Sequence, residues 1–327
     1  MSSAKIIGMG KYLPANIVFS SDLDKKLNLP EGSVQKKSGL VSRHFARVSE
    51  TTSYMASQAA LHAVEQAGIT LAEIDAIIGA CGAGEQPIPC TAVLVQKQLG
   101  LENTGIACFD INSTCLSFLT ALDAASYMLS GGRFNRILIV SSDIPSFGLD
   151  WSDLETCTIF GDGAAACIVE RSNDSSRILA AHMKTYSFGA AFCQVQAGGT
   201  FMPPASEYDK KYGLFKMDGK RVFKLASQMI GPMQEELFAK ASITLNDVDW
   251  VVPHQASLLA MHHIRKKLGI PGEKFVDIYT THGNQMAASL PSALCHLIHN
   301  HNLERGQLVY LLGTGAGLSA AGVILEY

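Results

Sequence analysis

The sequence predicts an α/β fold, in the form of a layered αβαβα sandwich built from two similar halves. Three observations support this prediction. The second half of the chain repeats the pattern of the first, the expected strands are apolar along their whole length, and one helix in each half is rich in small residues. Such strands are typical of sheets that helices cover on both faces. Small side chains let a helix pack closely between two of these sheets.

The repeat relates four pairs of segments that occur in the same order and at nearly constant spacing. The pairs are 69–78 (ITLAEIDAII) with 243–252 (ITLNDVDWVV), 109–111 with 276–278, 136–143 with 307–314, and 161–170 with 315–326. A repeat of this length indicates duplication of a whole unit and not a short-period solenoid. We therefore expect two duplicated halves, residues 1–175 and 176–327, in one compact body.

Each half has the same expected order of elements: an amphipathic helix, a buried strand, a short strand ending in Asp-Ile, a small-residue helix and two apolar strands. In the first half these are 55–67, 76–80, 109–111, 116–129, 137–142 and 164–170, and in the second 222–241, 250–253, 276–278, 286–299, 308–313 and 320–326. Residues 184–221 have weak periodicity and many glycines and prolines. We expect an inserted loop region there, lying over a functional site.

Composition narrows the class of protein. The chain is 47% hydrophobic and 17% charged, so it can bury a large core and lacks the signature of disorder. Its formal net charge of −3 gives no reason to expect a nucleic-acid partner. The N-terminal MSSAKIIGMG is too short and too interrupted by glycine for a signal peptide or a membrane span. We therefore expect a cytoplasmic protein without a membrane partner.

The cysteines and histidines do not form a metal motif. Eight cysteines are present and no CxxC pair occurs among them, so in a reducing compartment most should be free thiols that pack as small hydrophobic groups. Segment 296–301 (HLIHNH) has three histidines, but no further Cys/His pair has ligand spacing. We expect neither a metal nor a cofactor.

Cys115 is the first candidate for chemistry. It follows the expected strand end FDI, and Asn112, Ser113 and Thr114 are residues that cap helices. A cysteine at or just inside a helix N-terminus is expected to favour the thiolate, which is the nucleophile needed to attack a thioester. The competing interpretation is a cysteine that only packs.

His254 and Asn284 are the second and third candidates. His254 follows a buried strand in DWVVPHQAS, and histidine is an acid–base group near neutral pH. Asn284, in THGNQMAASLPSAL, precedes a small-residue helix. Taken singly, the histidine could be an ordinary core or surface residue and the asparagine a simple cap or turn.

The duplication changes how these three residues are interpreted. Cys115 and Asn284 stand at the starts of equivalent helices, and His254 follows the strand equivalent to 76–80. In a fold with a pseudo-twofold axis such positions meet at the centre. Cys, His and Asn together indicate acyl transfer followed by enolate chemistry.

Motifs along the whole chain resemble those of the beta-ketoacyl-[acyl-carrier-protein] synthase III family, whose fold is the thiolase fold. In order they are KIIGMGKYLP at the N-terminus, the Cys115 segment, IFGDGAAA at 159–166, VPHQAS at 252–257, HGN at 282–284 and GTGAGLS at 313–319. In this thiolase fold the first half carries the nucleophile and the second carries the histidine and asparagine. The resemblance implies an acyltransferase that runs a ping-pong, decarboxylative Claisen condensation and gives a 3-oxoacyl thioester.

The resemblance also implies roles for individual residues. Cys115 takes an acyl group from a thioester, and His254 and Asn284 stabilise the enolate formed from a malonyl thioester. The backbone N–H groups of Cys115 and Ala316 form the oxyanion hole. Gly219 and Phe223 line the pantetheine tunnel.

Departures from the family pattern concern the substrate. Ser33 stands where the family has a tryptophan that stacks on adenine, and Lys37, Leu154 and Leu259 stand where it has arginines. Weaker recognition of the CoA nucleotide is expected from the changes at Ser33, Lys37 and Leu154. Leu259 replaces an arginine that the family uses for carrier-protein docking. Ile88 replaces a phenylalanine that narrows the acyl pocket across a dimer, and it also stands where head-to-head condensing relatives have a glutamate.

We therefore expect an acyl group longer than acetyl, donated on CoA or on acyl-carrier protein, and a homodimer. Basic residues remain that could meet an acidic carrier protein: Lys220, Arg221, Lys224, Arg265, Lys266 and Lys267. Two other functions stay open at this point. One is acyl transfer to an oxygen, nitrogen or sulfur acceptor without a new C–C bond. The other is a non-catalytic subunit of a heterodimer. The pathway, in fatty acid biosynthesis or secondary metabolism, is also open.

Overall fold

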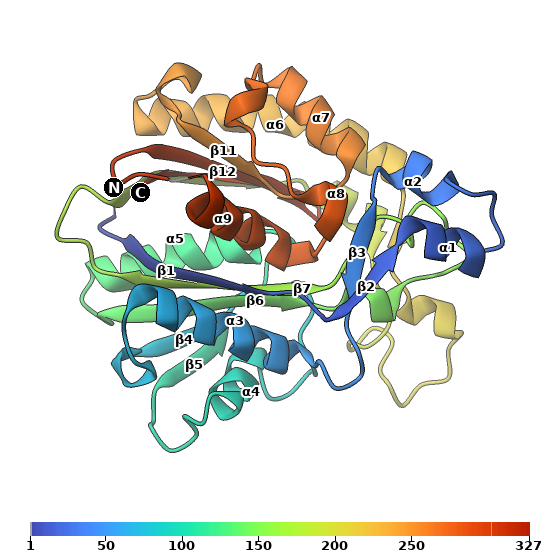
Figure 1. Cartoon of the computed structure of the whole chain (residues 1–327), viewed down its shortest axis with the longest axis horizontal. Helices are drawn as coiled ribbons and strands as arrows, with labels where there is room; N and C mark the ends of the chain where they lie inside the picture. Colours follow the sequence, from blue (N-terminus) through green and yellow to red (C-terminus); the bar gives the residue numbers. More distant parts are fainter. Residues whose placement is uncertain (1, 302) are drawn as a thin grey trace.

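The computed structural model of the chain describes residues 2–301 and 303–327. In this part of the chain the strands form two large sheets (Figure 1). The first has the order β1-β7-β6-β4-β5 and the second the order β11-β12-β13-β8. Their bounds are β1 Lys5–Tyr12, β4 Ala76–Gly79, β5 Ala107–Asp110, β6 Arg136–Asp143, β7 Gly163–Glu170, β8 Arg177–Thr185, β11 Trp250–Pro253, β12 Leu308–Gly315 and β13 Ser319–Glu326.

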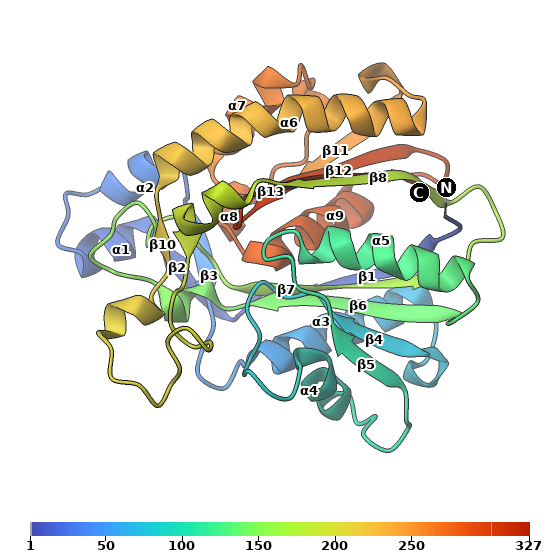
Figure 2. The same cartoon turned by 180° about the vertical axis from the view of Figure 1, so that it is seen from behind.

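Helices lie in three layers around these sheets. Helices α3 (Thr52–Ala67) and α4 (Thr91–Gln98) cover the outer face of the first sheet, and α6 (Gly219–Ala241) and α7 (Leu258–Lys267) cover the second (Figures 1 and 2). Helices α5 (Ser117–Ser130) and α9 (Ser289–Asn300) run between the sheets. The predicted αβαβα sandwich is therefore confirmed.

The two sheets have the same strand order, which reveals a strand in each half that the sequence analysis missed. The order β1-β7-β6-β4 corresponds to β8-β13-β12-β11, so β1 and β8 are equivalent. Strand β1 contains Gly8 and Gly10, which argue against a strand in sequence. They are needed because α3 lies so close that a side chain at Gly10 would approach the Ala59 carbonyl oxygen to 2.1 Å. The boundary between residues 175 and 176 stays a proposal, supported by the start of β8.

Several element bounds differ from the prediction, and three of these differences lie in or next to segments that lead into the site. Residues 276–278 form no strand, and the neighbouring Phe275 makes only an isolated bridge to Val251. Helix α5 begins at Ser117, and α9 begins at Ser289 after a 3-10 turn at Met286–Ala288. Cys115 and Asn284 therefore lie in the turns that precede their helices and not in the helices themselves.

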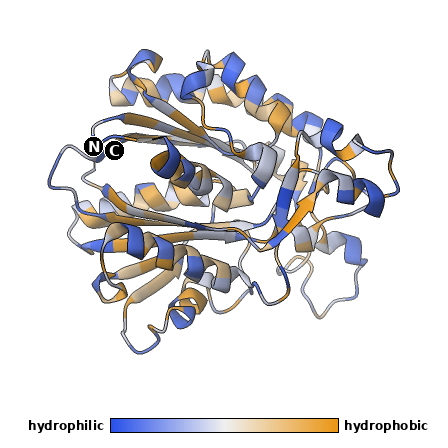
Figure 3. Cartoon of the chain, in the orientation of Figure 1, coloured by the Kyte–Doolittle hydropathy of each residue, from blue (hydrophilic) through white to orange (hydrophobic). Residues whose placement is uncertain are grey.

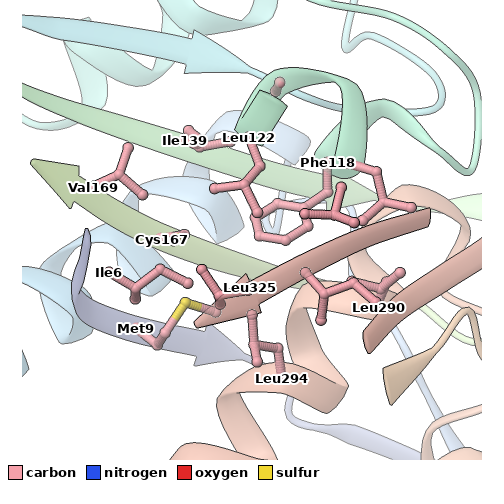
Figure 4. Packing of buried hydrophobic residues seen from close by; sticks show 14 of the residues in the cluster. Ile6, Met9, Phe118, Leu122, Ile139, Cys167, Val169, Leu290, Leu294 and Leu325 are labelled. Atoms are coloured by element: carbon pink, nitrogen blue, oxygen red, sulfur yellow. The ribbon is translucent and has the colours of Figure 1, made fainter. Parts of the chain in front are cut away.

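The central core lies between the two sheets and is built around the inner helices. Figure 4 shows Phe118 and Leu122 from α5 packed with Leu290 and Leu294 from α9, and with strand residues that include Ile6 and Leu325. The distribution of hydrophobic residues agrees with this layered arrangement. The outer helix α6 carries both hydrophilic and hydrophobic residues, whereas the sheet beneath it is mostly hydrophobic (Figure 3). A rigid centre of this kind holds the turns before α5 and α9 in place.

The remaining elements surround one end of the sandwich. They include the hairpin β2 (Asn16–Phe19) and β3 (Ser42–Phe45), helices α1 (Ser20–Lys26), α2 (Ser33–Ser38) and α8 (Tyr279–His282), and the paired β9 (Cys193–Gln194) and β10 (Lys216–Met217). The last two strands and the 3-10 turns Ser187–Phe192 and Lys210–Gly213 belong to the expected loop region 184–221. This region lies beside the N-terminal end of α6.

Candidate active site

A cavity of about 1030 Å³ opens between the two halves, and Cys115, His254 and Asn284 all line it. Each comes from a different part of the sequence: the turn before α5, the end of β11 and the turn before α9. The structure thus brings together the three residues that the sequence analysis expected to meet.

Backbone pairing holds the Asn284 turn against the segment that precedes β7. The Asn284 N–H donates to the Ile159 carbonyl at 2.9 Å, and the Gly161 N–H donates to the Asn284 carbonyl at 3.2 Å. Gly283 has φ +68°, and a side chain at Gly161 would lie 2.1 Å from the His282 carbonyl oxygen. Glycine is required at both positions, which explains why IFG and HGN occur as motifs.

The glycines of the segment 313–317 bring His254 and Cys115 close to the same strand. A side-chain carbon at Gly313 would lie 2.9 Å from Cβ of His254, and one at Gly315 would lie 2.8 Å from Oγ1 of Thr114. Strand β12 can therefore run between the histidine and the cysteine turn only because it lacks side chains there.

The turn that presents Cys115 is itself under local strain. Thr114 has φ +54°, a conformation that costs a β-branched residue on the order of 1–3 kcal/mol. Hydrogen bonds maintain it: the Thr114 N–H donates to Asn112 Oδ1 at 2.9 Å, and the Ser117 hydroxyl donates to the Thr114 carbonyl at 2.7 Å. The strain is held by the surrounding structure and fixes where the Cys115 side chain points.

Burial keeps the Cys115 thiol protonated, contrary to the expectation of a thiolate. Its pKa is raised to about 12, chiefly by burial and also by the nearby Cys193 and Asp143, whereas the N–H groups of Ala316 and Cys115 act to lower it. Because α5 begins two residues later, its N-terminus does not compensate for the loss of water around the sulfur. Reaction at Cys115 therefore requires a proton acceptor.

His254 is suited to accept that proton. Burial lowers its pKa to about 4, so the imidazole is neutral at pH 7. Its Nδ1 lies 2.6 Å from Oγ of Ser289, and its backbone N–H donates to the Leu312 carbonyl at 2.8 Å. The ring is thus oriented through Nδ1, and the backbone of the residue is held by β12.

The Asn284 amide is oriented by two contacts. Its Oδ1 accepts from the Met286 N–H at 2.9 Å, and its Nδ2 donates to the Ala256 carbonyl at 3.2 Å. The oxygen must face an N–H and the nitrogen must face a carbonyl, so these two contacts determine which end of the amide is the oxygen and which is the nitrogen. One N–H of Nδ2 remains to serve a ligand.

Comparison with known proteins now adds to this geometry. Residues 109–187 match the family model described as 3-Oxoacyl-[acyl-carrier-protein (ACP)] synthase III, and residues 238–327 match its C-terminal model. The Beta-ketoacyl-[acyl-carrier-protein] synthase III of Aquifex aeolicus is 36% identical over 99% of this chain and 99% of its own. The chain belongs to the 3-oxoacyl-[acyl-carrier-protein] synthase III family.

Two solved structures agree with this assignment. The crystal structure of the Aquifex aeolicus synthase III has a TM-score of 0.89 and 34% identity, covering 99% of this chain and 100% of that chain. The priming beta-ketosynthase from the R1128 polyketide biosynthetic pathway has a TM-score of 0.88 and 28% identity, covering 99% and 96%. This synthase III family member is accordingly an acyl-thioester condensing enzyme with the thiolase fold, and both expectations are confirmed.

Other residues named from the sequence fall into two groups. Gly219 and Phe223 line the cavity, and the Phe223 ring stacks against His263 with centroids 4.6 Å apart. Ile88 does not reach the cavity of its own chain, because its side chain is 85% exposed on a loop before α4. Among the positions where this chain departs from the family pattern, Lys37 and Leu259 line the cavity, whereas Ser33 and Leu154 do not.

Some of the basic residues named from the sequence line the cavity, and others do not. Lys220 lines the cavity, as does Lys36, which the sequence analysis did not single out. The four expected docking residues do not line it and lie on α6 and α7: Lys224, Arg265, Lys266 and Lys267. Lysines at the cavity thus belong to α2 and the start of α6, near the loop region 184–221.

Sequence reasoning missed three further residues that touch this site. Cys193 lines the same cavity as Cys115, Asp143 accepts N–H groups from two of its loops, and Ser289 holds His254. Cys193 lies in the weakly patterned loop region, so no periodicity marked it. Asp143 ends a strand and Ser289 lies in a small-residue helix, where both look structural.

Neither a cluster of metal ligands nor a membrane-spanning helix occurs in the part of the chain that the structure describes. Within residues 2–301 and 303–327, no three or more His, Cys, Asp or Glu side chains gather as metal ligands would. No helix in this part of the chain has both the length and the apolar character needed to cross a bilayer.

Proposed function

We propose that this enzyme condenses an acyl group held on Cys115 with a malonyl thioester, by a ping-pong route through one cavity. The observation that carries the proposal is that a neutral thiol, a neutral imidazole and an oriented amide all line the same cavity. Family membership supports the class of reaction, and these residues account for its steps.

The first half-reaction acylates Cys115. His254 takes the thiol proton on its free nitrogen while the sulfur attacks the donor carbonyl. A new C–S bond forms to Cys115, the donor C–S bond breaks, and the departing thiolate takes the proton from His254. The N–H groups of Cys115 and Ala316, which already interact with the Cys115 sulfur, stabilise the negative oxygen of the tetrahedral intermediate.

The second half-reaction forms the carbon–carbon bond. The malonyl C–C bond breaks, CO₂ leaves, and the electron pair gives a thioester enolate whose oxygen accepts the remaining Asn284 N–H. His254 donates to the same oxygen once its free nitrogen carries a proton, a state that the negative charge of a bound malonyl carboxylate favours. The enolate carbon attacks the acyl group, the bond to Cys115 breaks, and the released Cys115 thiolate takes the proton that His254 acquired from solvent, so one solvent proton is consumed in each condensation.

The cavity also suggests how a thioester is held. Gly219 and Phe223 would contact the pantetheine arm, and Lys36, Lys37 and Lys220 would face the phosphate that CoA and carrier proteins share. Lys224, Arg265, Lys266 and Lys267 would then meet an acidic carrier-protein surface. Small residues beside Cys115, such as Gly82 and Ala83, leave room for an acyl chain longer than acetyl.

We propose that the enzyme works as a homodimer. Strand β5 lies at the edge of the first sheet, and within the described residues no strand pairs with its outer edge. An unpaired edge favours addition of another strand. The exposed Ile88 lies on the loop before α4, the helix that packs against this edge strand, where a second copy could cover it and carry it toward the partner's cavity. All eight cysteines are free thiols, which supports the proposed cytoplasmic location.

The decisive experiment supplies purified enzyme with an acyl thioester and malonyl-carrier protein carrying a labelled carboxyl group. Labelled CO₂ and a 3-oxoacyl product in equal amounts are expected, and Cys115→Ser, which cannot hold the acyl group, should give no 3-oxoacyl product. Acyl transfer to an oxygen, nitrogen or sulfur acceptor with no release of CO₂ would overturn the proposal.

A further inference from the structure

The Ser289 hydroxyl lies between His254 and a backbone carbonyl. Its Oγ is 2.6 Å from His254 Nδ1 and 2.8 Å from the Met286 carbonyl oxygen. Ser289 is fully buried at the start of α9, and His254 is 6% exposed.

The single hydrogen of this hydroxyl decides which way the hydrogen bonds run. A carbonyl oxygen can only accept, so the Ser289 O–H must donate to Met286. The same oxygen can then only accept from His254, and Nδ1 must carry the hydrogen. A neutral imidazole has one N–H, so Nε2 is left with a free lone pair.

The surroundings keep the imidazole neutral and turn Nε2 toward the cavity. Within residues 2–301 and 303–327, no carboxylate is a hydrogen-bond partner of His254, whose ring contacts Ser289 through Nδ1. His254 lines the cavity together with Cys115, and Nδ1 is engaged by the buried hydroxyl, so Nε2 is the nitrogen left to act on Cys115 and the substrate.

We propose that Ser289 is a positioning residue that fixes His254 as the Nδ1–H tautomer and so leaves Nε2 as the proton acceptor for Cys115. The hydroxyl is held in place by the 3-10 turn before α9, where the Ala287 N–H donates to the buried Asp143 carboxylate at 3.1 Å. The kinetic role of Ser289 rests on the proposed function, whereas the tautomer does not.

The tautomer is tested directly on the unliganded wild-type protein. Nitrogen-15 NMR of histidine-labelled enzyme at pH 7, with His254→Asn to identify the signals, distinguishes a protonated from an unprotonated nitrogen at each position. A protonated Nδ1 and an unprotonated Nε2 are expected. A protonated Nε2 with an unprotonated Nδ1 would overturn the proposal, whether or not the enzyme condenses anything.

The kinetic role is tested with three variants on the same helix. Ser289→Ala should slow self-acylation by about tenfold, the worth of one hydrogen bond, with little change in donor KM, and its His254 signals should no longer show a single tautomer. Ser289→Thr keeps the hydroxyl and should recover most of the rate. Ser292→Ala is the matched control, because the buried Ser292 Oγ lies one turn further along α9 and has no partner among the described residues; it should acylate at the wild-type rate.

Two kinetic outcomes would overturn the proposal. One is a Ser289→Ala enzyme that is folded by circular dichroism and acylates as fast as wild type. The other is an equal loss in Ser289→Ala and Ser292→Ala, which would show a packing effect. A wild-type enzyme that acylates Cys115 but releases no CO₂ would instead count against the proposed condensation and leave the Ser289 result valid.

Discussion

The carboxylate of Asp143 accepts the Ala287 N–H at 3.1 Å and so joins the first half of the chain to the turn before α9. The other carboxylate oxygen accepts the N–H groups of Gly82 and Ala83, each at 2.9 Å. Gly82 and Ala83 line the cavity. One buried side chain therefore holds two walls of the active site together.

Replacing Asp143 by Asn should change how stability depends on pH. Burial raises the pKa of Asp143 to about 7 from an ordinary 3.8, so between these values the folded protein holds a proton that the unfolded chain has released. Stability from this group therefore falls as pH rises from about 4 to about 7. Relative to Asp143→Asn, the wild type should lose about 2–3 kcal/mol of unfolding free energy between pH 5 and pH 8.

Urea unfolding of both proteins at pH 5 and pH 8 measures this difference. Asparagine also loses one hydrogen-bond acceptor, which shifts its stability by a similar amount at every pH. A difference between the two proteins that does not vary with pH would contradict the assigned pKa.

Cys115→Ser should abolish stable acylation, because a serine hydroxyl has neither the nucleophilicity nor the acidity of a thiol. Intact mass after incubation with an acyl thioester measures the adduct. Cys193 lies in the same cavity, so any remaining adduct must be located by peptide mapping. Cys193→Ser should keep the adduct, and its loss there with retention in Cys115→Ser would mean that the nucleophile has been assigned wrongly.

His254→Ala and Asn284→Ala should affect the two half-reactions differently. Asn284→Ala removes a donor to the enolate and should slow CO₂ release by about 10²–10³-fold while leaving self-acylation nearly intact. His254→Ala removes the proton acceptor as well, so it should slow both steps. Stopped-flow acylation and labelled CO₂ release measure them separately, and an Asn284→Ala enzyme that releases CO₂ at the wild-type rate would refute its role.

As pH is lowered, the rate of self-acylation should fall only at a pH well below the ordinary pKa range of histidine. Burial lowers the pKa of His254 to about 4, so the neutral acceptor persists as pH falls from 8 to about 5 and is lost only near 4. The rate constant for acylation of Cys115, measured under single-turnover conditions across this range, tests the prediction. A limb centred near 6.5 would show that His254 is not desolvated as the structure indicates.

The acyl preference should lie beyond acetyl. Each methylene buried beside Cys115 stabilises the complex by about 0.8 kcal/mol, which is up to several-fold in kcat/KM per carbon until the space is filled. The comparison is of acetyl to decanoyl donors on CoA and on carrier protein. Carrier-bound donors are expected to be preferred, and a clear optimum at acetyl-CoA would contradict the prediction.

Much of the architecture and the identity of the three central residues could be predicted from the sequence alone. The duplication gives each half the same order of elements, and equivalent positions in such halves meet at the axis between them. Cys115, His254 and Asn284 could be chosen because each follows a strand or precedes a small-residue helix at such a position. Short local patterns were enough, since strand and helix periodicity are properties of neighbouring residues.

Only the tertiary structure decided the chemical state of these residues. Whether Cys115 is a thiol or a thiolate depends on how much water surrounds it, and the sequence suggested the wrong answer. The hydrogen on His254 is set by Ser289, which is far from it in sequence and looks like a packing residue in a helix of small side chains. Asp143 likewise contacts Ala287 in the other half of the chain. Desolvation and hydrogen-bond direction arise from contacts between distant segments, and no local pattern of side chains encodes them.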